Sequence, residues 1–413
     1  MQIIVFEDSL VEQLEPLSLA RPAYSLVCGS LSLADWLNQQ DRPIRGLVRP
    51  HLEAWQAAEQ PGFHRETRDG WRLLVNARLV PCPTTFETLR RLERTGEPGL
   101  VFQGETLAAG LLPPSAPDLD DPWRAEAFEE FLRDPRIESL PVLEAPLPLV
   151  NYAHDLIRSH LDVLGDNLQW RLESGRYREV RDGVFVAQNV ELAEWVHVDS
   201  SQGPIVVDAG AVVRPFACLR GPLYLGPMSR VNEHALLKSG VSVGPQAKVG
   251  GEVEASVIEA CSSKQHLGYL GHSYVGQWVN LGAGTSNSNL KNTYGSIRIE
   301  VGDRRVDTGL QFLGCIVGDM TRTAINTSIF TGKLIGTCSA LYGFITTNVP
   351  SFVNYARSFG EITELSPAVM VELQKRVFLR RGIQQQDWHR QLLHDVYNRV
   401  ALGRQLADRP VSL

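Results

Sequence analysis

Between residues 207 and 249 an aliphatic side chain recurs at every sixth position. The residues of this phase are Val207, Val213, Leu219, Leu225, Val231, Leu237, Val243 and Val249. A small or apolar residue follows each of them by four positions: Ala211, Ala217, Leu223, Ser229, Ala235, Val241, Ala247 and Val253. Neither the period of an amphipathic helix nor that of a half-buried strand produces this pattern. A hexapeptide repeat is typical of a left-handed parallel β-helix.

In such a β-helix three short strands form each triangular coil, and the aliphatic side chains stack inside it in columns. No single coil can bury its own apolar face, so the coils depend on their neighbours. Upstream, Val184, Val190 and Val196 follow one another at six-residue spacing, and a small insertion around residues 200–204 resets the spacing to Val207. Downstream, Ile329 and Ile335 are again six residues apart. We therefore expect the β-helix to occupy residues 184–350.

The N-terminal part of the chain has a different pattern. Apolar runs at 3–6 and 72–75 predict buried strands, and the spacing of 86–92 predicts a helix. Alternating strands and helices indicate an α/β domain, Rossmann-like, with a mainly parallel sheet. Ligands of such sheets bind at the carboxyl ends of the strands. The polar segments 7–8 and 76–78 would lie there.

These patterns predict the domain organisation. We expect the α/β domain at 1–150, a helical linker at 151–183, the β-helix at 184–350 and a C-terminal helical tail at 351–413.

Composition excludes several classes of protein. The net charge of −7 argues against a nucleic-acid partner, which would require a basic face. No apolar run approaches the ~18 residues that would span a membrane, and the N-terminus lacks the features of a signal peptide. The six cysteines are scattered without a Cys-x-x-Cys pair, which fits a reducing compartment. We expect a cytoplasmic protein without a membrane partner.

The repeat breaks at residues 262–269, where a polar loop leaves the rigid β-helix and could carry a site. His266 is a candidate general base, because imidazole titrates near neutral pH. Tyr269, Asn280 and Asn289 could bind hydroxyl, phosphate or amide groups. His272 lies nearby and could be either a partner of this site or a bystander.

The motifs of this region resemble a known family. His266-Leu-Gly-Tyr-Leu-Gly, Val-Asn280-Leu-Gly-Ala-Gly-Thr and Asn289-Leu match, without gaps, the acetyltransferase signature of the bifunctional N-acetylglucosamine-1-phosphate uridyltransferase / glucosamine-1-phosphate acetyltransferase family. The sequence is most similar to a divergent branch of sugar nucleotidyltransferases. The motifs cover about residues 210–345, and the architecture covers the whole chain.

The resemblance implies acetyl transfer from acetyl-CoA to the amine of a sugar phosphate. His266 corresponds to the base that takes a proton from the amine as the amine attacks the thioester. Tyr269 and Asn280 correspond to groups that hold the sugar phosphate, and Asn289 to a group near the acetyl-CoA. Direct transfer needs no nucleophilic serine or cysteine, and a positioned base contributes about 10²–10⁴-fold.

The resemblance also implies a cofactor groove and an assembly. Asp319 and Thr337 fall near positions that line the groove for the pantetheine arm of acetyl-CoA. β-Helix acyltransferases of this kind form homotrimers, with the groove between neighbouring prisms. Cys261 is interpreted as a structural residue.

One departure from the family concerns the acceptor. Where the family has a lysine for the sugar phosphate, this sequence has Glu254. A phosphate-binding cation would then have to come from Arg220, Lys238 or Lys264, and the identity of the acceptor stays open.

The N-terminal domain departs further. The family's glycine-rich, phosphate-cradling loop is replaced by a segment without glycine. Arg21 resembles a nucleotide-binding lysine, and Asn76 stands where an aspartate would bind Mg²⁺. Asp155 resembles a second metal-binding aspartate, but could equally cap a helix. Nucleotidyl transfer from a nucleoside triphosphate is thus either retained or degenerate.

Two other functional hypotheses are alternatives to a transferase. One is a non-catalytic scaffold or sensor that binds sugar nucleotides with the same folds. The other is a zinc enzyme with histidines between β-helices, but the spacing of His197, His234, His266 and His272 singles out no set of three ligands.

Overall fold

The computed structural model describes residues 1–63, 70–302 and 304–401. The chain forms two compact units, Met1–Tyr152 and Ala153–Leu413. The first unit contains a five-stranded sheet in the order β2-β1-β3-β5-β4. Its strands are β1 (Gln2–Phe6), β2 (Ile44–Leu47), β3 (Arg72–Asn76), β4 (Gly99–Gln103) and β5 (Thr106–Leu112). Its α-helices are α1 (Leu33–Leu37), α2 (Glu53–Glu59), α3 (Pro83–Thr95), α4 (Ala125–Leu132) and α5 (Pro135–Glu138).

The sheet of the first unit is mixed. Strand β1 runs parallel to β2 and β3, whereas β5 runs antiparallel to both β3 and β4. The α/β class is confirmed, but the expectation of a mainly parallel sheet is only partly met. The turn between β4 and β5 is two residues long, with Gly104 at a φ of 61°. A connection this short permits only an antiparallel pair, because parallel strands need a long crossover.

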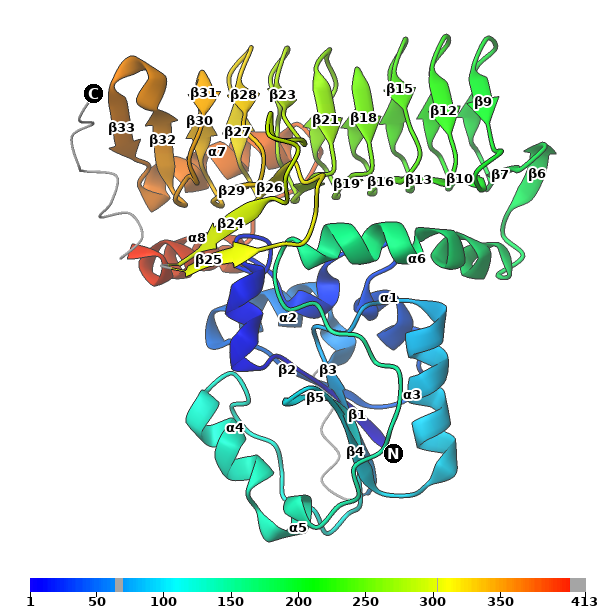
Figure 1. The fold of residues 1–413 in the computed structure, drawn as a ribbon, viewed down its shortest axis with the longest axis vertical. Helices are drawn as coiled ribbons and strands as arrows, with labels where there is room; N and C mark the ends of the chain where they lie inside the picture. Colours follow the sequence, from blue (N-terminus) through cyan, green and yellow to red (C-terminus); the bar gives the residue numbers. More distant parts are fainter. Residues whose placement is uncertain (64–69, 303, 402–413) are drawn as a thin grey trace. The chain divides into compact units, whose positions relative to one another are not determined.

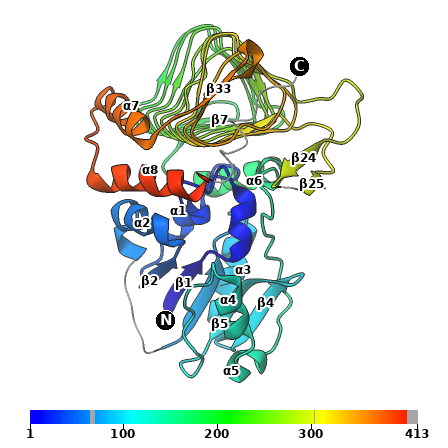
Figure 2. The ribbon, with the colours of Figure 1, turned by 90° about the vertical axis from the view of Figure 1, so that its left-hand side faces the viewer.

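The second unit is a triangular prism of stacked coils (Figures 1 and 2). The left-handed β-helix predicted from the hexapeptide repeat is thus confirmed. The first face contains β6 (Arg178–Arg181), β7 (Val184–Val186), β10 (Ile205–Val207), β13 (Leu223–Leu225), β16 (Val241–Val243), β19 (Val257–Ile258), β22 (Tyr274–Val275), β26 (Cys315–Val317) and β29 (Lys333–Ile335). The second contains β8 (Glu191–Leu192), β11 (Val212–Val213), β14 (Arg230–Val231), β17 (Lys248–Val249), β20 (Ser263–Lys264), β27 (Arg322–Thr323), β30 (Ala340–Leu341), β32 (Val353–Ala356) and β33 (Glu361–Glu364). The third contains β9 (His197–Asp199), β12 (Cys218–Arg220), β15 (Leu236–Leu237), β18 (Glu252–Glu254), β21 (Tyr269–Gly271), β23 (Ser286–Asn287), β28 (Ser328–Ile329) and β31 (Phe344–Ile345).

The repeat residues fill the interior of the prism. All eight residues of the repeat from Val207 to Val249 are at most 1% exposed. Parallel pairing aligns them in columns, for example Val213 with Val231 and Val231 with Val249. Each buried aliphatic side chain contributes roughly 1.5–3 kcal/mol. The columns therefore hold consecutive coils in register.

Helices and one hairpin lie outside the coils of the second unit. The helices are α6 (Asp155–Leu172), α7 (Pro367–Leu379) and α8 (Asp387–Arg399), and the hairpin is β24 (Arg298–Val301) with β25 (Arg304–Asp307). Helix α7 lies along the prism (Figure 2). The ring of Phe378 in α7 packs against Trp278 of the prism, with 4.6 Å between the ring centroids. Arg158 of α6 donates to the backbone oxygen of Thr308 at 2.7 Å, which ties the hairpin segment to α6. No described helix combines the length and apolar character needed to cross a bilayer.

Candidate active site

The third face of the prism is interrupted between β21 and β23. Strands β9 to β21 form one sheet and β23 to β31 another. At the interruption, side chains replace backbone carbonyls as acceptors. The Tyr269 N–H donates to Ser286 Oγ at 3.1 Å, and the Gly271 N–H donates to Asn287 Oδ1 at 2.8 Å. The face thus keeps its stacking while its backbone ladder opens beside the predicted site.

Four side chains form a hydrogen-bonded cluster at this interruption. The Tyr269 hydroxyl donates to Glu254 Oε2 at 2.9 Å and accepts from Asn289 Nδ2 at 2.8 Å. The same Asn289 nitrogen lies 2.9 Å from His272 Nδ1. Because an amide nitrogen only donates, His272 Nδ1 is the acceptor and its proton lies on Nε2. The cluster of Glu254, Tyr269, Asn289 and His272 is called the polar cluster below.

The polar cluster holds its tyrosine and histidine in their neutral forms. Burial raises the pKa of Tyr269, and the Glu254 carboxylate acts in the same direction. Burial lowers the pKa of His272, which the Glu254 charge opposes. Lys238 balances the carboxylates, with its amine 2.7 Å from Glu252 and 3.5 Å from Glu254. The hydrogen bond to Glu252 is the main cause of a raised pKa of Lys238.

The predicted base His266 lies next to this cluster but outside it. It occupies the bend between β20 and β21, at the edge between the second and third faces, and its side chain is exposed. Within the described parts of the chain, its ring forms no hydrogen bond. Asn280 is also exposed, on the second face, where its backbone bridges Ser263 and Arg322. A single chain therefore leaves His266 without an orienting partner.

Lys264 points into the prism instead of toward a ligand. Its backbone pairs with Val249, so that its side chain takes a place in an aliphatic column, and it is 2% exposed. The amine donates to the backbone oxygens of Gly250 at 3.0 Å and His266 at 2.6 Å. Burial lowers the pKa of Lys264 to about 8. This placement does not offer the amine to a phosphate.

Arg220 lies apart from the polar cluster. It is the exposed last residue of β12, and three strand spacings separate β12 from β21. At the usual distance between neighbouring strands, this corresponds to roughly 14 Å. Of the three cations considered for a phosphate, only Lys238 is close to the cluster, and its charge is already balanced by carboxylates.

The predicted pantetheine residues lie at a different edge of the prism. Asp319 follows β26 and Thr337 follows β29, so both lie between the first and second faces. They are 6% and 1% exposed, and Asp319 Oδ1 accepts from the Gln277 N–H at 2.7 Å. Within one chain the structure brings Asn289 and Tyr269 together, but it does not bring Asp319 or Thr337 to them.

Ion pairs occupy the strand ends of the first unit. Arg49 Nε donates to Glu7 Oε2 at 3.1 Å. Arg78 donates from Nε and Nη2 to the two oxygens of Asp8, at 2.8 and 2.7 Å. All four side chains are buried. Such pairs are costly to break, because either partner alone would be a buried, uncompensated charge.

The two predicted nucleotide-binding residues are buried beside these pairs. Asn76 is fully buried, and its Nδ2 donates to Asp8 at 2.8 Å and to the Leu107 carbonyl at 2.9 Å. Its Oδ1 accepts from the Arg78 N–H at 2.9 Å. Arg21 is 1% exposed. Because the oxygens of Asp8 and Asn76 are already engaged by donors, they do not fit a Mg²⁺ ion, which prefers free oxygen ligands.

Asp155 begins helix α6 in the second unit. Its carboxylate lies 3.5 Å from both the His154 ring and the Arg158 guanidinium. Burial lowers the pKa of His154, an effect that the Asp155 charge opposes. Over residues 1–63, 70–302 and 304–401, no three His, Cys, Asp or Glu side chains gather where they could hold a metal ion.

Comparisons with known proteins agree with this architecture. Residues 3–176 match the family model described as sugar nucleotidyl transferase. The chain is 33% identical over 117 residues to a bifunctional sugar-1-phosphate nucleotidylyltransferase/acetyltransferase of Sulfurisphaera tokodaii, covering 28% of each chain. It is 28% identical over 225 residues to the bifunctional protein GlmU of Ralstonia nicotianae, covering 52% of this chain and 48% of that protein. The resemblance predicted from the motifs is thus confirmed, at modest identity.

These alignments have a limited extent. The chain spans about half the length of the Ralstonia relative and less of the Sulfurisphaera relative. Among solved structures, a UDP-N-acetylglucosamine acyltransferase of Francisella novicida aligns over 55% of this chain and 82% of its own, with 10% identity and a TM-score of 0.32. The strand pairing of this chain itself defines the prism.

Sequence reasoning identified Tyr269 and Asn289 but left His272 undecided. The backbone of His272 has a φ of 48°, a conformation that few residues with a side chain adopt. The chain turns at this point, and the ring reaches both Asn289 and the face of Phe312, at 5.3 Å between centroids. A sequence pattern carries no signal for such a turn at a histidine.

The pH dependence of stability should report the buried Lys264 amine. Its pKa is about 8 in the folded chain and about 10.4 in an unfolded one. Between these values the unfolded state holds a proton that the folded state has released. The free energy of unfolding should therefore rise with pH across this window, by up to roughly 3 kcal/mol.

Urea unfolding of wild type and Lys264→Met at about pH 7.5 and about pH 10 measures this gain, which the variant should lack. Lys375→Met, which removes an exposed lysine of α7, is the control and should behave like wild type. The same pH dependence in wild type and Lys264→Met would contradict the prediction.

Proposed function

We propose that this protein is a cytoplasmic acyltransferase that moves the acetyl group of acetyl-CoA to the amine of a sugar phosphate. The observation that carries the proposal is the polar cluster at the interruption of the third face. It combines one carboxylate, two neutral hydrogen-bonding rings and an amide beside an exposed imidazole. The GlmU-type relatives and the six free cysteines of the chain support the class of enzyme and the reducing compartment.

In this proposal His266 accepts the proton that the sugar amine loses as it attacks the thioester carbonyl. The new amide bond forms while the thioester bond breaks, and the thiolate of CoA leaves and takes up a proton. Tyr269 and Asn280 would position the sugar, and Asn289 would lie near the acetyl group. His272 would act as a positioning residue, because its ring holds the amide of Asn289.

A homotrimer would complete this site, and we include it in the proposal. His266 lies on an edge of the prism where Trp195, Phe216 and Leu267 are 73%, 55% and 73% exposed. The rings of Phe216 and His234 stack along this edge at 5.2 Å between centroids. A neighbouring prism packed here would cover the apolar side chains and could bring a different edge, with Asp319 and Thr337, toward His266.

Acetyl-CoA and glucosamine 1-phosphate should together release free thiol in the presence of the wild-type protein. His266→Ala should lower kcat/KM by about 10²–10⁴-fold, the usual contribution of a positioned base. His272→Gln should raise KM more than it lowers kcat, because it removes positioning and leaves the base in place. Release is followed with a chromogenic thiol reagent.

His197→Ala is the matched control, because His197 is an exposed histidine on the third face at β9, far along the prism from β21. It should keep wild-type kinetics. Absence of thiol release with several amino sugars would favour the non-catalytic scaffold, and full activity of His266→Ala would remove the assigned base.

The proposed trimer is tested by sedimentation, in which the wild-type protein should have the mass of three copies of the chain. Phe216→Asp should shift the distribution to smaller species, because a carboxylate at an apolar interface is costly to desolvate. Phe359→Asp changes a phenylalanine elsewhere that is even more exposed, at 71% against 55% for Phe216, and should leave the mass unchanged. A stable wild-type monomer would contradict the proposed assembly.

For the first unit we propose a nucleotidyltransferase fold whose transfer chemistry is degenerate. The buried pairs of Glu7 with Arg49 and of Asp8 with Arg78 support this, because they occupy the strand ends. Incubation with Mg²⁺, a sugar 1-phosphate and either UTP or dTTP should release no pyrophosphate above background. Release that Arg21→Ala abolishes would instead show a retained nucleotidyltransferase.

A further inference from the structure

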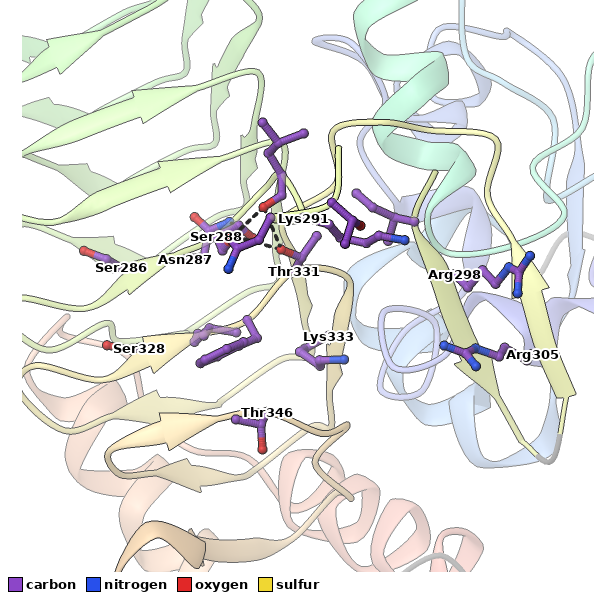
Figure 3. A pocket seen from close by; sticks show the side chains of 16 residues that line it. Ser286, Asn287, Ser288, Lys291, Arg298, Arg305, Ser328, Thr331, Lys333 and Thr346 are labelled. Atoms are coloured by element: carbon purple, nitrogen blue, oxygen red, sulfur yellow. Dashed lines mark hydrogen bonds between the residues drawn. The ribbon is translucent and has the colours of Figure 1, made fainter. Parts of the chain in front are cut away.

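A pocket of about 780 Å³ opens at the edge between the third and first faces of the prism, beside the β24–β25 hairpin (Figure 3). This volume lies in the range of small-molecule sites in proteins. The pocket is lined by hydroxyl, cationic and apolar side chains. Its hydroxyl-bearing residues are Ser286, Ser288, Thr293, Ser328, Thr331 and Thr346. The amides Asn287 and Asn292 and apolar side chains, among them Ile297, Ile329 and Phe330, also line it.

The charged residues that line the pocket are all cations: Lys291, Arg298, Arg305 and Lys333. Arg298 has a partner, Asp307, whose carboxylate lies 3.6 Å from its Nε. Across the described residues, no ion pair forms to Arg305 or Lys333. The pocket thus concentrates positive charge without an equal number of carboxylates.

Lys333 and Arg305 face each other across the pocket (Figure 3). Burial lowers the pKa of Lys333, and the Arg305 charge lowers it further, against the effect of Glu300. Two cations held close to each other disfavour each other's charged form. An anion between them would relieve this repulsion and would also accept hydrogen bonds from the guanidinium fork.

The pocket continues the surface of the polar cluster. Ser286, which lines the pocket, accepts the hydrogen bond of the Tyr269 backbone, so the two residues lie on adjacent strands. Ser288 and Leu290, on either side of Asn289 in the chain, also line the pocket. A ligand of modest length could therefore place one end in the pocket and the other against Asn289.

We propose that this pocket binds the phosphate group of a substrate whose reactive end lies at the polar cluster. It would supply the phosphate-binding cations that the cluster lacks, since Glu254 stands at the family's lysine position and Lys264 is turned inward. The identity of the ligand rests on the proposed acyl transfer. The phosphate belongs either to the sugar phosphate or to the nucleotide part of CoA, and both present the same chemistry to Arg305 and Lys333.

Isothermal titration calorimetry of the full-length protein with inorganic pyrophosphate, glucosamine 1-phosphate and adenosine 3′,5′-bisphosphate tests this site. Arg305→Gln and Lys333→Gln should each weaken binding by about tenfold or more, as expected for loss of a charge-assisted hydrogen bond. Arg304→Gln is the matched control. Arg304 precedes Arg305 in β25, is exposed, and does not line the pocket, so its loss should change affinity less than about twofold.

Each result has a defined meaning. Weakened sugar-phosphate binding in both variants assigns the pocket to the acceptor, and weakened bisphosphate binding assigns it to the cosubstrate. No binding of any of the three compounds, or an equal loss in Arg304→Gln, overturns the proposal. Because pyrophosphate binding needs no turnover, the site can be confirmed even where no thiol is released, which separates its failure from failure of the proposed function.

Discussion

The stacking of aliphatic side chains inside the prism is the interaction on which the rest of the second unit depends. Its strands are only two to four residues long, and a strand of this length has almost no stability alone. Each coil is held by burial against its two neighbours and by the parallel ladders between them. The outward residues then follow one another at the spacing of neighbouring strands, about 4.8 Å. Glu252 and Tyr269, which are cross-strand partners, are positioned in this way and not by a local motif.

At the candidate site the interior columns contain polar residues. Lys264 replaces an aliphatic residue in one column, and Asn287 replaces one in another, where its amide bonds the N–H and the carbonyl of Gly271. Both side chains satisfy their hydrogen bonds with backbone groups, as buried polar groups must. Such local departures from a repeat concentrate where a protein sacrifices stability for function. Here the departure coincides with the opening of the backbone ladder between β21 and β23.

The sequence predicted the prism well because its signal is periodic. The inward direction of a residue such as Val231 follows from its place in the repeat, and no long-range information is needed. The pairs Arg49–Glu7 and Arg78–Asp8 join residues 42 and 70 positions apart, and neither partner signals the other in the chain. The same holds for the inward direction of Lys264, which is decided by its pairing with Val249 on the neighbouring strand. Tyr269 and Asn289 were found through a resemblance of motifs, whereas their shared hydrogen bond required the fold.

The chain leaves the prism between β23 and β26 to form the β24–β25 hairpin. The two strands of the hairpin pair only with each other and add no strand to the three faces. Its attachment comes from the buried Ile297 and Ile299 and from the bond between Arg158 and Thr308. Two of the four cations of the pocket, Arg298 and Arg305, belong to this appendage. Substitutions in the hairpin could therefore change the charged groups of the pocket while the aliphatic columns of the prism stay the same. The residues that select a ligand and the residues that stabilise the fold can in this sense evolve at different rates.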